Sequence, residues 1–216
     1  LVGPGVVGHV DGLHAAAERI GVAVVNTWGA KGVFRWDSPF HGGTAGLQAR
    51  DFELAGLGDV DVLVTSGLDP DEVTSTPWEG RAEVVDVPPA DLADLPTWWD
   101  QPRQEPTPPR LYTELSAVVM PMYADPSTPP ARLRAMSEQL EPGATAYAPP
   151  GLLGYWVART WPTTVPGSVV VPARVDHVVP DGAVRIELDG VDLTIPQSLL
   201  DVAGPVVAWP DLPNWG

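Results

Sequence analysis

The chain has 216 residues, no cysteine and a formal net charge of −16 at pH 7, with a pI near 4.3. This composition excludes disulfides, thiolate metal sites and a cysteine nucleophile, and the negative field disfavours binding to nucleic acid or to an anionic membrane. No apolar run approaches membrane-spanning length, so we expect a cytoplasmic chain of one or two domains.

The first residues have the pattern of a strand, helix, strand unit. Residues 1–7 predict a strand that enters a glycine turn, residues 12–20 predict a helix with one apolar face, and residues 22–25 predict a buried strand. Because the strand pattern is present from the first residue, we interpret the chain as a piece of a longer polypeptide.

Residues 3–8 match the dinucleotide-binding pattern G-x-G-x-x-G. Pro4 lies inside this pattern, however, and Asn26 stands where an acidic residue would close the second strand. A plain glycine turn is therefore the better interpretation, and a conventional NAD site is not expected.

Residues 26–46 form a glycine-rich loop at the carboxyl end of the second strand, which is where open α/β sheets bind ligands. Its glycines permit sharp turns and close backbone approach, and Lys31 in this loop is the only lysine of the chain. A loop that only turns the chain is the alternative. His41, also in the loop, has no base or nucleophile near it in sequence and is interpreted as a hydrogen-bonding residue.

The remaining pattern alternates short helices and strands. In chain order we expect helix 47–57, strands 60–64 and 82–87, a helical turn in 88–95, helices 111–120 and 131–140, strand 144–148, helix 151–161, a β-hairpin formed by 184–188 and 191–195 around Asp189-Gly190, a helical turn 198–202 and strand 206–209. The acidic residues 69–72 are interpreted as a helix cap rather than a cation site. Residues 96–109 are rich in proline and predict a stiff connector, which divides the chain into domains 1–95 and 110–216.

Residues 1 to about 89 resemble the central domain of thiamine-diphosphate-dependent enzymes of the acetolactate synthase and benzoylformate decarboxylase type. The resemblance is carried by residues 1–6, by 24–27 with 31–34, by 37–39 with Gly43 and Gly46, and by 60–64 ending at Gly67. It implies a Rossmann-like parallel sheet with flanking helices. In some members that domain binds FAD, ADP or coenzyme A, and in others it binds nothing. The backbone that would cradle a nucleotide lies here at Gly3, Gly5, Thr27, Lys31, Gly43, Gly46 and Gly67.

The second part resembles a reduced form of the family's C-terminal domain. In complete members that domain holds thiamine diphosphate and Mg²⁺ through a Gly-Asp-Gly motif and a distant Asn, together with an N-terminal domain for which we expect no counterpart within these 216 residues. The nearest match here is Pro180-Asp181-Gly182 with Asn214, which lacks the leading glycine and has a longer gap. The resemblance therefore implies no metal site and no catalytic residue in this chain.

Three functions follow from these observations. The first is a non-catalytic scaffold that forms a homo-oligomer or assembles with missing catalytic domains. The second is a binding module for an adenine nucleotide such as FAD, ADP or coenzyme A. The third is a part of a thiamine-diphosphate carboligase or decarboxylase that needs its other domains.

Overall fold

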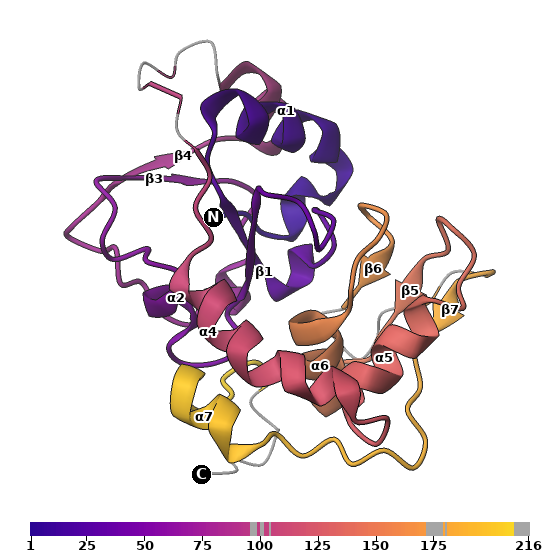
Figure 1. Cartoon of the computed structure of the whole chain (residues 1–216). Coiled ribbons are helices and arrows are strands. Elements are labelled where there is room, and N and C mark those ends of the chain that lie inside the picture. Colours follow the sequence, from indigo (N-terminus) through magenta and orange to yellow (C-terminus); the bar gives the residue numbers. More distant parts are fainter. Residues whose placement is uncertain (96–98, 100–101, 104, 172–178, 180, 210–216) are drawn as a thin grey trace.

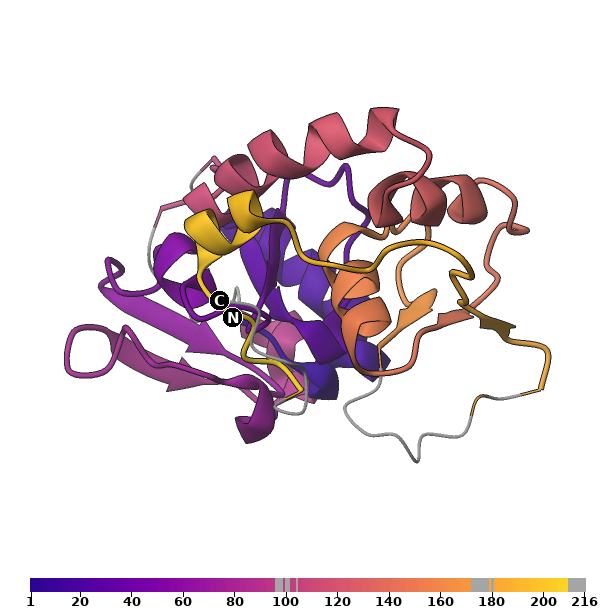
Figure 2. The ribbon, with the colours of Figure 1, turned by 90° about the horizontal axis from the view of Figure 1, so that it is seen from below.

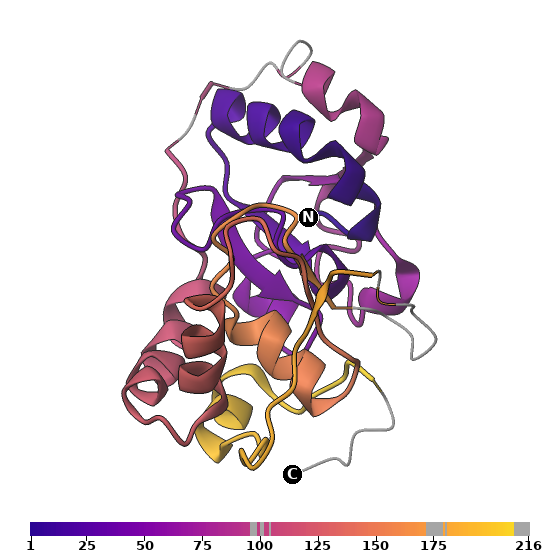
Figure 3. The same cartoon turned by 90° about the vertical axis from the view of Figure 1, so that its right-hand side faces the viewer.

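The computed structural model describes residues 1–95, 99, 102–103, 105–171, 179 and 181–209. Figure 3 shows α1 (Val10–Ile20) at one end of the molecule and the helices of the second half of the chain at the opposite end. The strands of the first half lie between them (Figure 1). The second half of the chain therefore meets the first half on the side of these strands that lies opposite α1.

Parallel strands form the centre of the first half. β1 (Val24–Thr27) pairs with β2 (His41–Ala45), and β3 (Val62–Thr65) pairs with β4 (Glu83–Asp86). Val2 joins the two pairs, because it bridges β1 on one side and the residue after β3 on the other. The spatial order β2, β1, Val2, β3, β4 is that of a doubly wound sheet, and it confirms the expected α/β, Rossmann-like class.

Helix α1 follows the apolar period of its sequence. Its buried residues lie at helical spacing on one face, and they are Leu13, Ala16, Ala17 and Ile20. The helix ends at Gly21, whose φ of 81° gives the left-handed conformation that closes helices, and whose N–H donates to the Ala17 carbonyl. α1 packs on the 3₁₀ helix η4 (Pro89–Asp94), which takes the place of the helical turn predicted in 88–95.

Residues 1–7 are not the continuous strand that their sequence predicts. Only Val2 makes strand contacts, and η1 (Pro4–His9) is a 3₁₀ helix. The reason is Pro4, which has no N–H to donate to a neighbouring strand and whose fixed φ suits the first position of a helix.

The glycine-rich stretch 26–46 contains strand β2, which its sequence did not predict. Glycines at positions 42 and 43 leave no alternation of side chains to detect. They are required by close packing: a Cβ on Gly42 would lie 2.9 Å from the Val24 carbonyl oxygen, and Gly43 has a φ of 104°. Backbone contact with β1 therefore specifies this strand.

Four helices dominate the second half: α4 (Arg110–Val119), α5 (Pro129–Ser137), α6 (Leu152–Thr160) and α7 (Gln197–Ala203). The short 3₁₀ helix η5 (Met120–Ala124) lies between α4 and α5 in the chain. Figure 2 shows α7 lying beside α4, and α5 packs on α6. All four helices agree in position with the sequence predictions to within a few residues.

The β-hairpin predicted over 184–195 is wrong. β7 (Val184–Arg185) pairs in parallel with β5 (Ala146–Tyr147), which also pairs with β6 (Val169–Val170). A turn does form at Asp189-Gly190, but residues 191–195 make no strand. The apolar residues of this alternating pattern are buried in the shared core instead: Ile186 and Ile195 are 0% and 4% exposed.

Two further predictions are corrected in length. The helix predicted over 47–57 is reduced to α2 (Asp51–Leu54), and the strand predicted over 206–209 is a single bridge between Val206 and Gln48. The polar residues Gln48 and Asp51 are fully buried. The conformation of this segment is therefore determined by the hydrogen bonds of these two side chains and not by a helical repeat of apolar residues.

A single hydrophobic cluster contains residues from both halves of the chain, including Leu47 and Phe52 from the first and Trp156 and Leu199 from the second. The division into domains 1–95 and 110–216 stays a prediction, and the two parts share an apolar interface. Among the described residues, no helix is both long enough and apolar enough to cross a bilayer.

Candidate functional site

The glycine turns at the carboxyl edge of the sheet pack against one another. The Gly5 N–H donates to the Gly67 carbonyl at 2.9 Å, and a Cβ on Gly3 would lie 2.5 Å from the same oxygen. Gly67 itself has a φ of 58° and contacts the backbone of Gly5. These three glycines therefore serve a backbone-to-backbone contact at the point where a doubly wound sheet commonly leaves a crevice.

A buried carboxylate from another segment lies against the loop that follows β1. Glu72, in η3 (Pro70–Glu72), is 1% exposed, and its Oε2 accepts a hydrogen bond from the Gly29 N–H at 3.1 Å. A Cβ on Gly29 would collide with this carboxylate, and a Cβ on Gly46 would lie 2.6 Å from the Glu72 carbonyl oxygen. The glycines of this loop thus make room for a residue of the chain itself.

Burial raises the pKa of Glu72 to about 7, and the hydrogen bonds from the Thr27 side chain and from the Gly29 N–H offset only part of that effect. The nearby carboxylates of Asp69 and Asp71 raise the pKa further. Glu72 therefore changes its charge near neutral pH in the folded protein.

Several polar atoms at the carboxyl ends of β1 and β3 are buried without a hydrogen-bond partner. They are Asn26 Oδ1, Trp28 Nε1 and Ser66 Oγ. Buried polar groups in folded proteins nearly always have a partner, whether protein, water or ligand. This edge of the sheet is thus the part of the first half with the most unused hydrogen-bonding capacity.

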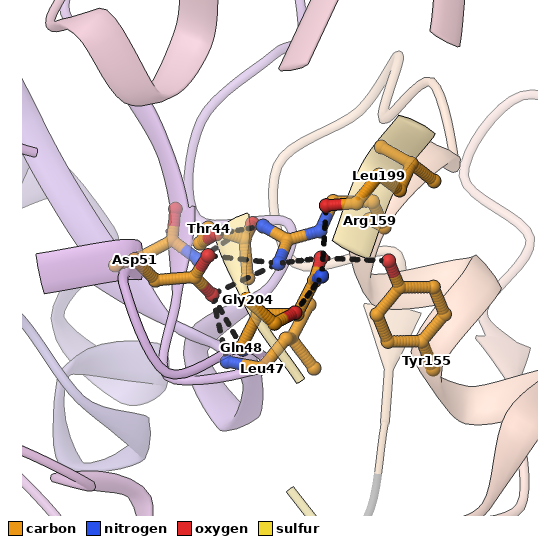
Figure 4. Close-up of polar contacts among 9 residues, drawn as sticks. Thr44, Leu47, Gln48, Asp51, Tyr155, Arg159, Leu199 and Gly204 are labelled. Carbon is orange, nitrogen blue, oxygen red and sulfur yellow. Dashed lines mark hydrogen bonds and ion pairs between the residues drawn. The ribbon is translucent and has the colours of Figure 1, made fainter. Parts of the chain in front are cut away.

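A buried ion pair joins the two halves of the chain (Figure 4). Arg159 of α6 donates from Nη2 to both carboxylate oxygens of Asp51, at 3.0 and 2.9 Å, and the two side chains are 2% and 0% exposed. Asp51 Oδ2 also accepts the N–H groups of Leu47 and Gln48, each at 2.9 Å. Burial raises the pKa of the Asp51 carboxyl, and the guanidinium and both N–H donors oppose that rise.

Gln48 extends this network to the other helices of the second half. Its Oε1 accepts from the Tyr155 hydroxyl at 2.8 Å, and its Nε2 donates to the carbonyls of Leu199 and Gly204 at 3.2 and 2.6 Å. Arg159 completes the set by donating from Nη1 to the Thr44 carbonyl of β2 at 2.9 Å. The network thus connects β2 and α2 to α6 and α7.

A cavity of about 300 Å³ adjoins the Arg159 end of this network and is lined by residues of β2, α4, α5 and α6. Lys31 and His41 face it. Burial, with the charge of Arg159 adding to it, lowers the pKa of Lys31 to about 8. Burial and then the charge of Lys31 lower the pKa of His41 to about 3, so this imidazole is neutral at physiological pH.

The residues predicted from sequence to cradle a nucleotide fall into three places. Gly3, Gly5 and Gly67 form the glycine contact, Thr27 and Gly46 lie beside Glu72, and Lys31 and Gly43 line the cavity. Their role in binding stays a prediction.

Sequence reasoning missed Arg159 and Asp51, which lie 108 positions apart. One signal was available, because Arg159 is the only charged residue of the otherwise apolar and small-residue helix α6. A lone charge in a buried helix needs a partner, although the sequence does not say which one.

The described residues contain no group of three or more histidines or carboxylates placed to hold a metal ion. Asp181, the acidic residue of the reduced motif, is exposed in a turn, and Asn214 lies outside the described residues.

A comparison with known protein families finds a match for the first half of the chain. The family model described as thiamine pyrophosphate enzyme, central domain, matches residues 1–93. No curated protein matches the chain.

The raised pKa of Glu72 predicts a pH-dependent effect of the substitution Glu72→Gln. The pKa is about 7 in the folded protein and 4.5 in the unfolded chain, so the stability that Glu72 contributes falls as pH rises through this window. Relative to the wild type, E72Q should therefore gain up to about 3 kcal/mol of unfolding free energy between pH 4.5 and pH 8. Urea unfolding of both proteins at several pH values measures this difference in unfolding free energy. His41 is present in both proteins, so its titration does not contribute to the difference.

Glu83→Gln is the control, because Glu83 is exposed on β4. E83Q should follow the pH profile of the wild type. A profile of E72Q that runs parallel to the wild type would contradict the raised pKa.

The buried ion pair predicts a large cost for the substitution Arg159→Met. R159M leaves the Asp51 carboxylate buried without its guanidinium, which costs about 3–5 kcal/mol of unfolding free energy. Arg134→Met removes the same type of side chain from the exposed pair Arg134–Glu138 and should cost less than about 1 kcal/mol. Urea unfolding at pH 7 compares the two, and equal losses would show that the buried pair does not hold the halves together.

Proposed function

We propose that residues 1–93, which match the central-domain model of the thiamine pyrophosphate enzyme family, serve in this chain as a non-catalytic scaffold to which the second half is fixed. The observation that carries this proposal is the buried carboxylate of Glu72 in η3, which accepts a hydrogen bond from the Gly29 N–H of the loop after β1. The Glu72 carboxylate accepts the hydrogen bond of a backbone N–H group that would otherwise be available to a bound phosphate.

The surrounding groups support the same function. Phosphates are bound by free backbone N–H groups and by cations. Here the N–H of Gly29 donates to Glu72 and that of Gly5 donates to Gly67. The only lysine, Lys31, faces the cavity beside α4 and α6 rather than the glycine contact.

The described residues do not fit thiamine diphosphate with Mg²⁺. Among them, no group of three or more histidines or carboxylates could hold a metal ion, and Asp181 is exposed in a turn. A carboligase or decarboxylase activity of the acetolactate synthase type would therefore have to come from catalytic domains that assemble with this chain. We propose that the chain works in such an assembly or as a homo-oligomer.

An adenine-nucleotide binding module is the second candidate. One observation favours it: the unpartnered polar atoms of Asn26, Trp28 and Ser66 lie at the edge of the sheet where nucleotides bind in doubly wound folds. FAD, ADP or coenzyme A would supply partners for these atoms, but their phosphates would have to lie near Glu72.

A thermal-shift screen against FAD, ADP, coenzyme A, and thiamine diphosphate with Mg²⁺ separates these functions, because a ligand that binds only the folded state raises the melting temperature. The scaffold proposal predicts no concentration-dependent shift with any of the four. A shift with an adenine nucleotide that becomes larger in E72Q would establish the binding module and overturn the scaffold. A shift with thiamine diphosphate would overturn both.

A further inference from the structure

The cavity between the two halves has the size and the walls of a small-molecule site. Its volume of about 300 Å³ is at the lower end of the range for ligand pockets. Trp36 and Met120 line it and are 50% and 61% exposed, so they mark its opening to solvent. The interior is formed by buried residues of both halves.

Three nitrogen atoms of the lining residues have no hydrogen-bond acceptor among the described residues. Lys31 is 7% exposed, and no residue in the described part of the chain accepts a hydrogen bond from its ammonium group. His41 Nδ1 and Arg159 Nε are fully buried and have no partner. Such atoms are expensive to bury, and their presence around one cavity points to a missing acceptor.

The charges around the cavity leave one cation unbalanced. Arg159 is paired with Asp51, and Arg134 is paired with Glu138, the only acidic residue of the lining. Among the residues that the structure describes, Lys31 has no acidic partner. In a chain with a net charge of −16, an unpaired buried ammonium group is a specific local feature, and an anion would neutralise it.

The rest of the wall is apolar and aromatic. Leu111, Leu115 and Trp161 are buried, and they line the cavity. Tyr123 is turned so that its hydroxyl donates to the Thr160 carbonyl at 2.7 Å, and its polar end is thereby satisfied within the protein. A ligand of this cavity therefore needs a hydrophobic body and a single anionic end.

We propose that this cavity binds a small monocarboxylic acid with an apolar or aromatic body, whose carboxylate pairs with the Lys31 ammonium group and accepts a hydrogen bond from the His41 ring. The hydrophobic part of the acid packs between α4 and Trp161. The site is formed jointly by the two halves of the chain, so a bound acid would stabilise their association. This site is separate from the contact of Gly3 and Gly5 with Gly67, and from the place where Glu72 meets Gly29.

The probe is 3-phenylpropanoate, measured by isothermal calorimetry on the full chain at pH 7, with 3-phenylpropan-1-ol as the neutral analogue of the same shape. The wild type should bind the acid at least about tenfold more tightly than the alcohol, because only the carboxylate pairs with Lys31. This comparison needs no variant and so does not depend on the folding of one.

Lys31→Met tests the named partner. K31M should bind the acid at least about tenfold more weakly and keep the weak affinity for the alcohol, whereas Arg132→Met, which removes an exposed positive charge from α5, should bind like the wild type. Equal affinities of the wild type for acid and alcohol, unchanged acid binding by K31M, or no heat of binding up to the solubility of the acid would each overturn the proposal.

Discussion

The buried ion pair between Asp51 and Arg159 is the interaction on which the arrangement of the two halves depends. Both side chains are buried, two backbone N–H groups donate to Asp51, and Gln48 Oε1 accepts a hydrogen bond from Arg159. Buried pairs add little net stability compared with apolar packing, but they are costly to break and strict in geometry. The pair therefore fixes how α6 meets β2 and α2, and with it the shape of the cavity that lies between them.

Much of the fold follows from local sequence patterns. The period of 3.6 residues gave α1 with its four buried residues, and the second-half helices also lie where their sequences predict. The failures share one cause, which is that long-range packing overrides local pattern. Gly42 and Gly43 form a strand because β1 lies against them, and the alternating residues 184–195 do not pair with each other because Ile186 and Ile195 enter the core.

The site was less accessible to sequence reasoning than the fold. The glycines at positions 3, 5, 46 and 67 do mark close backbone approach, but the sequence could not say that Gly67 and Glu72 would be the approaching groups. Glu72 was interpreted only as part of a helix cap. The partner of Arg159 lies 108 residues away, a distance over which no local spacing applies. Buried polar partners are chosen by tertiary structure, so a single sequence shows one member at most.

In the scaffold proposal, the Glu72 carboxylate lies against the glycine-rich loop in the place of a ligand. The Gly29 amide reports on it directly, since this N–H donates to the carboxylate and its NMR chemical shift follows the charge of Glu72. In a pH titration the Gly29 resonance should move with an apparent pKa of about 7 and should not respond to added ADP. A midpoint near the ordinary glutamate value of 4.5, or a shift of this resonance that saturates with ADP, would show that the loop is open to a nucleotide.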